Sequence, residues 1–188
     1  MADTTAGTYQ SGPGSGRVLL KTGRAGMAAR AGHDLTIEVT RWSARVTVPD
    51  EEGGGLTAAT VSVELDLGSL AVREGTGGAR PLTESDRRDI EATARKILGS
   101  GTAAFTSTRI TRAPGGGSIQ GTLTLNGKSQ PAWVQVRAPS PGTYRGSATV
   151  KQTDFGITPY SGFFGALKLR DEVTLEFELD LTPTPDQP

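Results

Sequence analysis

Residues 172–181 read Glu-Val-Thr-Leu-Glu-Phe-Glu-Leu-Asp-Leu, a strict alternation of polar and apolar side chains. Because successive residues of a β-strand point to opposite faces, this period of two predicts a strand with one buried and one solvated face. The same alternation runs through residues 35–48 and returns, with four aliphatic side chains, at residues 61–67. The chain is therefore predicted to fold mainly as antiparallel strands.

Shorter segments add further candidate strands at residues 17–22, 103–111, 118–125, 132–137 and 144–152. The dipeptide Asn126-Gly127 separates two of them, and it tolerates the positive φ angles that a type I′ hairpin requires. The strands on either side of this dipeptide are therefore predicted to be antiparallel neighbours.

One helix is predicted to begin after Thr83 and to end before Gly99. Thr83 is a good N-cap, and the acidic residues just after it suit the helix dipole. The apolar residues Ile90, Ala94, Ile97 and Leu98 lie on one stripe of this helix, so it is predicted to pack by one side. About eight strands with one amphipathic α-helix favour an all-β antiparallel barrel or sandwich over a parallel α/β sheet.

The length of 188 residues favours one domain. Residues 1–16 are almost all small or polar, so we expect a flexible N-terminal tail, a β-barrel domain over residues 17–182 and a C-terminal tail over residues 183–188. The N-terminal residues lack the basic and apolar regions of a secretory signal, which predicts a cytoplasmic protein. No apolar run is long enough to predict a membrane span.

Charge and residue types narrow the chemistry. Twenty Lys and Arg balance twenty Asp and Glu, so the net charge gives no reason to expect binding to nucleic acid. Without cysteine and with one histidine, the sequence predicts neither a metal site nor a cofactor. His33 and Asp34 are neighbours on a predicted strand and would point to opposite faces, so they are not expected to form a catalytic pair.

The aromatic residues are few but clustered. Four of the ten, Phe155, Tyr160, Phe163 and Phe164, lie between Asp154 and Gly165, where glycines and a proline interrupt any simple strand. Such a segment can line a cavity entrance, or it can fold onto the core as a plug. Composition leaves both interpretations open.

Several sequence landmarks occur in a fixed order along residues 17–182, and together they resemble the YceI-like family. These landmarks are Gly32-His33-Asp34-Leu35 before Trp42, Asp66-Leu-Gly-Ser-Leu-Ala-Val72, Phe105-Thr-Ser107, Gly121-Thr-Leu-Thr-Leu-Asn-Gly127 with Pro131, Asp154-Phe-Gly-Ile157 and Asp171-Glu-Val173. The resemblance implies a lipocalin-like antiparallel β-barrel whose apolar interior holds a polyisoprenoid or another long amphiphile. Many members of the family are exported, whereas this sequence lacks a recognisable signal and has a longer polar helix.

A binding role needs apolar wall residues and a few polar contacts at the mouth, and it needs no catalytic residue. His33, Tyr160 and a nearby arginine are the candidates for the head group of the ligand. The full set of predicted ligand-binding residues is His33, Ile37, Trp42, Val63, Leu65, Phe105, Phe155, Tyr160, Phe163 and Phe164. The expected partner is an isoprenoid-like lipid or another amphiphile, and the sequence also allows a homodimer.

Two other functions stay open. The barrel could hold a small substrate near His33 and act as an enzyme, in which case His33→Ala would lower the rate by orders of magnitude. Alternatively its own side chains could fill the barrel, and the protein would then serve as an interaction module with an exposed apolar patch. We rank the lipid carrier first, the enzyme second and the filled barrel third.

Overall fold

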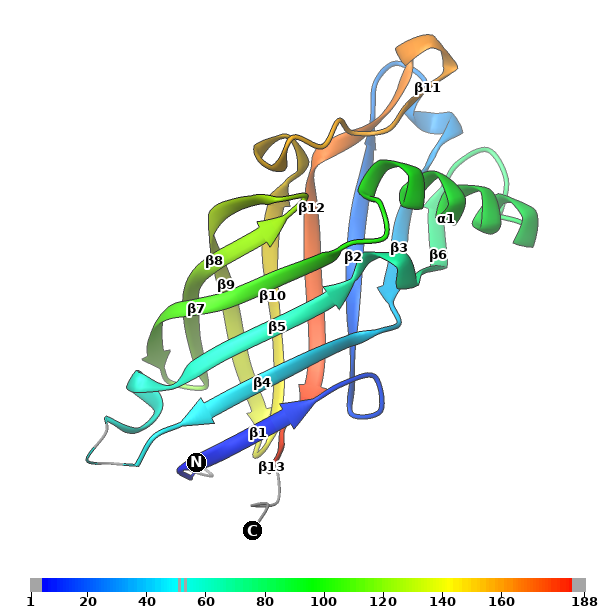
Figure 1. The fold of residues 1–188 in the computed structure, drawn as a ribbon. Helices are drawn as coiled ribbons and strands as arrows, with labels where there is room; N and C mark the ends of the chain where they lie inside the picture. Colours follow the sequence, from blue (N-terminus) through cyan, green and yellow to red (C-terminus); the bar gives the residue numbers. More distant parts are fainter. Residues whose placement is uncertain (1–4, 51, 53, 184–188) are drawn as a thin grey trace.

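The structure is a computed structural model that describes residues 5–50, 52 and 54–183. Its main feature is one strongly curled antiparallel sheet with a single α-helix at one end (Figure 1). The strands are β1 (Gly7–Ser11), β2 (Gly16–Ala25), β3 (His33–Val39), β4 (Trp42–Val48), β5 (Thr60–Asp66), β6 (Leu70–Gly77), β7 (Thr102–Ala113), β8 (Gly116–Leu125), β9 (Lys128–Ser140), β10 (Thr143–Lys151), β11 (Ser161–Gly162), β12 (Leu167–Asp180) and β13 (Thr182–Pro183). The helix α1 spans Glu84–Leu98.

Neighbouring strands follow the order β13-β1-β4-β5-β7-β8-β9-β10-β12-β2-β3-β6, with β11 paired to β12 outside this path. The all-β, barrel-like prediction is confirmed, whereas the count of about eight strands is not, because the sheet holds 13 strands among the described residues. Part of the excess comes from bends that divide long strands. β3 and β4 are separated by two residues, and β5 and β6 are separated by a single 3-10 turn at Leu67–Ser69.

The bends are held together by the landmark that starts at Asp66. The Asp66 carboxylate accepts a hydrogen bond from the backbone N–H of Gly68 at 2.8 Å and one from Arg41 Nε at 2.9 Å. The Arg41 guanidinium lowers the pKa of Asp66, with the Gly68 N–H as the next contribution. The buried Ser69 then accepts a hydrogen bond from the Arg41 N–H at 2.9 Å and so ties the two corners to each other.

The Asn126-Gly127 prediction is confirmed. Both residues have positive φ angles, 51° and 71°, and β8 and β9 are antiparallel neighbours on either side of them. A side chain at position 127 would meet no other atom, so glycine is favoured there because of the positive φ angle and not for lack of space.

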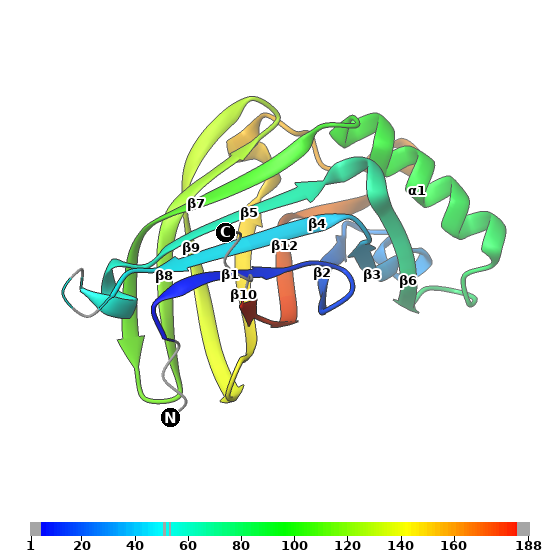
Figure 2. The same ribbon diagram turned by 60° about the horizontal axis from the view of Figure 1, so that its bottom comes forward.

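The helix prediction is also confirmed, with Thr83 as the N-cap in a capping box with Asp86. Its apolar stripe packs on the core beside Leu82, and Figure 2 shows α1 across the end of the sheet near β6. The helix also covers the edge of β6, because Glu91 Oε1 accepts a hydrogen bond from the Val72 N–H at 2.8 Å. This contact occupies one of the backbone donors at the free edge of the sheet.

The expected flexible tail over residues 1–16 is wrong for residues 7–11, which form β1. This strand pairs with β4 and with β13, and the partners of Tyr9 are Val46 and Pro183. The Tyr9 side chain is 8% exposed and packs with Val48 and Ala59 in a small second core. The backbone hydrogen bonds and one buried aromatic ring offset the entropy that is lost when these small and polar residues become ordered. Of the expected C-terminal tail, Pro183 lies in β13, and residues 184–188 lie outside the described part of the chain.

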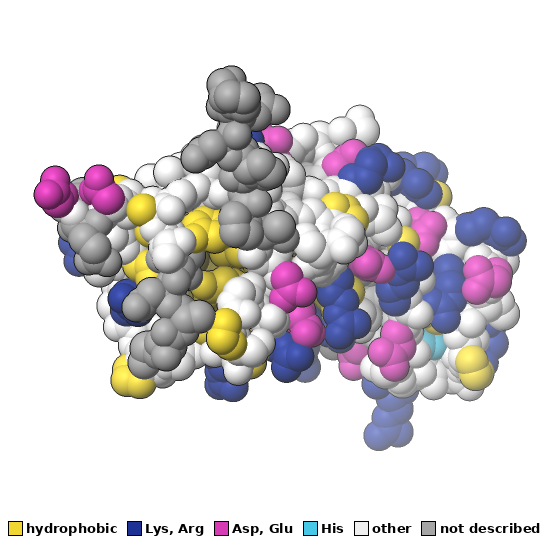
Figure 3. All heavy atoms as spheres, turned by 90° about the horizontal axis from the view of Figure 1, so that it is seen from below, with side chains coloured by type: hydrophobic (Ala, Val, Ile, Leu, Met, Phe, Trp, Pro, Cys, Tyr) yellow, Lys and Arg dark blue, Asp and Glu magenta, His cyan; other side chains and the backbone are white. Residues whose placement is uncertain are grey.

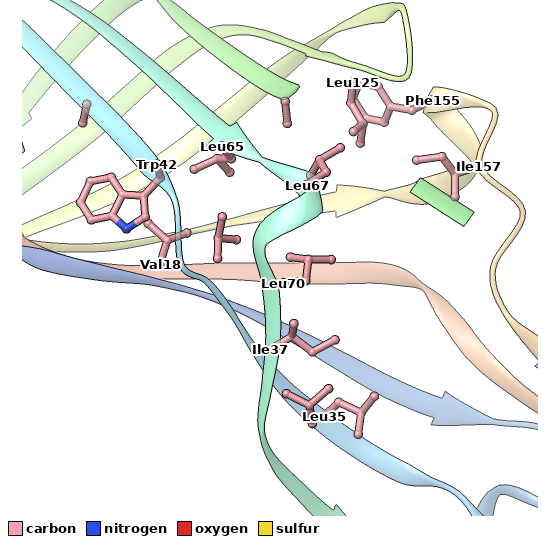
Figure 4. Close-up of a cluster of buried hydrophobic side chains, with 14 residues drawn as sticks. Val18, Leu35, Ile37, Trp42, Leu65, Leu67, Leu70, Leu125, Phe155 and Ile157 are labelled. Carbon is pink, nitrogen blue, oxygen red and sulfur yellow. The ribbon is translucent and has the colours of Figure 1, made fainter. Parts of the chain in front are cut away.

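Part of the main core packs against α1. Figure 4 shows Leu67, Leu125 and Phe155 close together, with Leu70 and Ile157 in the same cluster. This end of the barrel is therefore filled by side chains. Within the described residues, no helix has the length and apolar character that crossing a bilayer requires.

Candidate ligand-binding cavity

An apolar cavity of about 550 Å³ occupies the part of the curled sheet away from this filled end. Its wall consists of the inward-facing residues of β4, β5, β7, β8, β9, β10 and β12. Val63, Val134, Leu175 and Phe177 are typical of them. The volume lies within the range of about 300–1,000 Å³ that ligand pockets commonly have.

The cavity exists because several inward positions carry small residues. Ala44, Ala103, Ala132 and Ala148 line it, whereas leucine and phenylalanine side chains fill the corresponding space near α1. Protein interiors are otherwise close-packed, and the size of the inward side chains decides whether the inside of a curled sheet is filled or open to a ligand. Small residues on facing strands shift this barrel towards the second case.

Two glycines accommodate aromatic rings of the wall. A Cβ atom at Gly121 would lie 2.4 Å from Phe105 Cζ, and one at Gly146 would lie 2.4 Å from Phe177 Cζ. Real Cβ atoms do not approach a ring so closely. Each ring therefore lies directly on the backbone of a neighbouring strand, at a position that only glycine can occupy. The rings thereby line the cavity without filling it.

The mouth of the cavity lies at the end opposite α1. The lining includes Gly115 to Gly117 in the β7–β8 connection and Ser140 to Gly142 in the β9–β10 connection, together with Leu181. Figure 3 looks at this end and shows hydrophobic side chains inside a hollow. The cavity therefore opens between the two hairpin ends.

Four of the predicted ligand-binding residues line this cavity: Trp42, Val63, Leu65 and Phe105. Ile37 is 6% exposed and belongs to the main core without lining the cavity. The period-two alternation was sufficient to place these side chains on the inner face. It could not show which inner-face residues border empty space.

Of the aromatic segment, the described side chains of Phe155, Tyr160 and Phe164 do not line the cavity. Phe155 is 3% exposed and packs in the core, and its carbonyl accepts a hydrogen bond from Asn126 Nδ2 at 3.1 Å. Phe155 is thus a plug at the end opposite the mouth, and the entrance interpretation of this segment is wrong. Tyr160 and Phe164 are exposed, and the side chain of Phe163 lies outside the described part of the structure.

His33 is also remote from the cavity wall. Its Nε2 lies 2.7 Å from the carbonyl oxygen of Arg80, and its ring occupies the space beside Gly78. Asp34 instead accepts a hydrogen bond from the Arg24 N–H at 2.8 Å. His33 and Asp34 therefore have different partners, in agreement with the prediction that they do not form a catalytic pair.

Several wall residues were not predicted from the sequence, among them Ile110, Tyr144 and Phe177. Phe177 lies at the centre of the clearest alternating segment, so its inward position could have been assigned. Its cross-strand partner Gly146 has no side chain, and this glycine is the feature of the sequence that could have indicated room for the Phe177 ring. The described residues contain no group of three His, Cys, Asp or Glu side chains that could hold a metal ion.

A model of the YceI-like domain matches residues 20–181. Two solved structures have a similar fold. BcnA from Burkholderia cenocepacia has a TM-score of 0.59 at 17% identity, over 89% of this chain and 96% of that one. The YCEI protein of Campylobacter jejuni has a TM-score of 0.53 at 14% identity, over 80% of this chain and 85% of that one. Among curated proteins, none matches this chain.

Proposed function

The chain belongs to the YceI-like family, and from this premise we propose that it binds a long apolar amphiphile of the polyisoprenoid type in its cavity. In this role the protein transports or sequesters the lipid and catalyses no reaction on it. The observation that carries the proposal is the apolar cavity of about 550 Å³ with its mouth between two hairpins.

The cavity volume sets the length of chain that can be enclosed. An apolar cavity of about 150 Å³ holds one benzene molecule, so by proportion a volume near 550 Å³ accommodates about 20 carbon atoms. This corresponds to about four isoprene units or to one long fatty-acyl chain. A longer polyprenyl chain would extend beyond the mouth.

The wall residues suit a ligand without directional groups. Burial of apolar surface contributes about 25 cal/mol per Å², so aliphatic and aromatic side chains are sufficient for affinity. We assign contact with the chain to Trp42, Val63, Leu65 and Phe105, which line the cavity. Ile37 and Phe155 would support this wall from the core.

The two other functions have less support. An enzyme that uses His33 would need a substrate site beside that residue, whereas the cavity lining does not include it. A barrel filled by its own side chains would leave no space of this size. A cytoplasmic location and a homodimer stay predictions, which cell fractionation and light scattering respectively can test.

A pair of tryptophan substitutions on one strand tests the proposed function. Ala148 lines the cavity, whereas its neighbour Thr149 is exposed on the other face of β10. Ala148→Trp should fill the cavity and abolish binding of a fluorescent fatty acid such as cis-parinaric acid, and Thr149→Trp should leave this binding unchanged. Circular dichroism checks that both variants fold. Equal binding by the two variants would place the ligand outside the cavity and would contradict the proposal.

A further inference from the structure

One charged side chain stands on the otherwise apolar cavity wall. Among the described residues that line the cavity, Arg112 alone carries a formal charge, and no Asp, Glu or His accompanies it. The Arg112 side chain has no hydrogen bond or ion pair within the described part of the chain. By contrast Arg145, on a neighbouring part of the sheet, binds Glu178 at 2.7 Å.

The strand register places Arg112 on the inner face. Ile110 pairs with Ile119, and both line the cavity. Arg112 pairs with Gly117, two residues further along each strand. Because side chains two residues apart share a face, Arg112 follows Ile110 on the inside, at the mouth end of β7.

The strand position directly across from Arg112 is a glycine. Gly117 pairs with Val136 on β9, and Val136 pairs in turn with Gly146 on β10. Gly117 has no side chain, whereas the Phe177 ring covers Gly146. Arg112 is itself exposed, so a ligand group at the mouth can reach its guanidinium.

We propose that Arg112 binds the anionic head group of the amphiphile, which narrows the ligand to long-chain phosphates or carboxylates. This inference rests on the proposed function, since it needs the apolar chain to lie in the cavity. The chain would extend inward towards Trp42 and Leu65, and the head group would stay at the mouth. A guanidinium forms two parallel hydrogen bonds with a phosphate or carboxylate, and such charge-assisted bonds are stronger at the border of an apolar site than in water.

The test compares ligands that have the same chain and different head groups. Geranylgeranyl phosphate is measured against geranylgeraniol, and hexadecanoate is measured against hexadecanol, each by displacement of a neutral fluorescent probe from the full-length protein. The wild type should prefer the anion by about tenfold in at least one pair, and the pair that shows the preference identifies the phosphate or the carboxylate. Arg112→Gln should remove this preference and leave the affinity for the alcohols unchanged.

Two further variants separate a specific contact from general charge. Arg112→Lys keeps the charge but loses the paired geometry, so it should retain part of the preference. Arg109→Gln removes an exposed arginine of the same strand that does not line the cavity, and it should behave as the wild type. Equal affinity for anion and alcohol in the wild type, or a preference that survives Arg112→Gln, would overturn the inference while the proposed function stands. A protein that binds none of the four ligands would overturn both.

Discussion

Gly146 of β10 and Phe177 of β12 are direct cross-strand partners, and a Cβ atom at Gly146 would lie 2.4 Å from Phe177 Cζ. The aromatic ring thus lies over a strand position that has no side chain. Since Phe177 lines the cavity, this pair controls how much of the interior stays open.

Gly146→Ala should therefore narrow the cavity. The added methyl group would meet the Gln135 carbonyl oxygen and the Phe177 ring, so the free energy of unfolding should fall by about 1–3 kcal/mol. The affinity for a chain of about 20 carbons should fall as well, because the displaced ring occupies its space. Urea unfolding and a binding titration measure the two effects. Gly14→Ala is the control, since nothing lies within 4 Å of that position, and an equal effect there would refute the role assigned to Gly146.

Phe155 closes the barrel at the end near α1, and its removal should be costly. Phe155→Ala should lower the free energy of unfolding by about 3–5 kcal/mol, as expected when a fully buried aromatic side chain is truncated. Phe164→Ala, in the same segment but fully exposed, should change it by less than about 0.5 kcal/mol. Chemical denaturation measures both free energies of unfolding. Similar losses for the two variants would contradict the assignment of Phe155 as a plug.

Asp171 anchors the turn that carries Phe155. Its carboxylate accepts hydrogen bonds from the Thr153 hydroxyl at 2.6 Å and from the Thr153 N–H at 2.9 Å, and these bonds lower the pKa of Asp171. A lowered folded-state pKa means that the stabilisation is complete above the unfolded pKa of about 3.9 and is lost as the pH falls through the folded value. Asp171→Asn should therefore destabilise the protein at pH 7, and the difference from the wild type should shrink towards pH 2. Urea unfolding at several pH values measures this difference in the free energy of unfolding. If the difference does not change with pH, the charge of the Asp171 carboxylate does not contribute to stability.

A substitution of Tyr9 tests whether residues 7–11 form a strand of the sheet or a flexible tail. Tyr9→Ala should lower the free energy of unfolding by about 3 kcal/mol, because the ring is buried against Val48 and Ala59. Gln10→Ala, on the exposed face of the same strand, should be close to neutral. Thermal unfolding measures both. No effect of Tyr9→Ala would mean that residues 7–11 add nothing to the sheet.

The parts of the fold that depend on local pattern were predictable from the sequence. The alternation at residues 172–181, the Asn126-Gly127 hairpin and the Thr83 cap each depend on neighbours within a few residues. Trp42, Val63, Leu65 and Phe105 could be placed on the inner face for the same reason.

The missed parts depend on pairings between distant segments. Tyr9 is buried because β13 and β4 lie on either side of it, and no local pattern indicates that arrangement. The cavity is similarly a property of facing strands, in which Gly146 leaves room for Phe177. Phe155 is a plug because the cavity opens at the far end, and only the three-dimensional structure shows which end is open.

Native mass spectrometry of protein purified without detergent is the most direct test of the central claim that the cavity holds a long amphiphile. We expect one bound amphiphile per chain, or its uptake when geranylgeranyl phosphate and geranylgeraniol are added, in the wild type and in Thr149→Trp. Ala148→Trp should be free of ligand under the same conditions. A wild-type protein that carries no lipid and takes up neither compound would contradict the account.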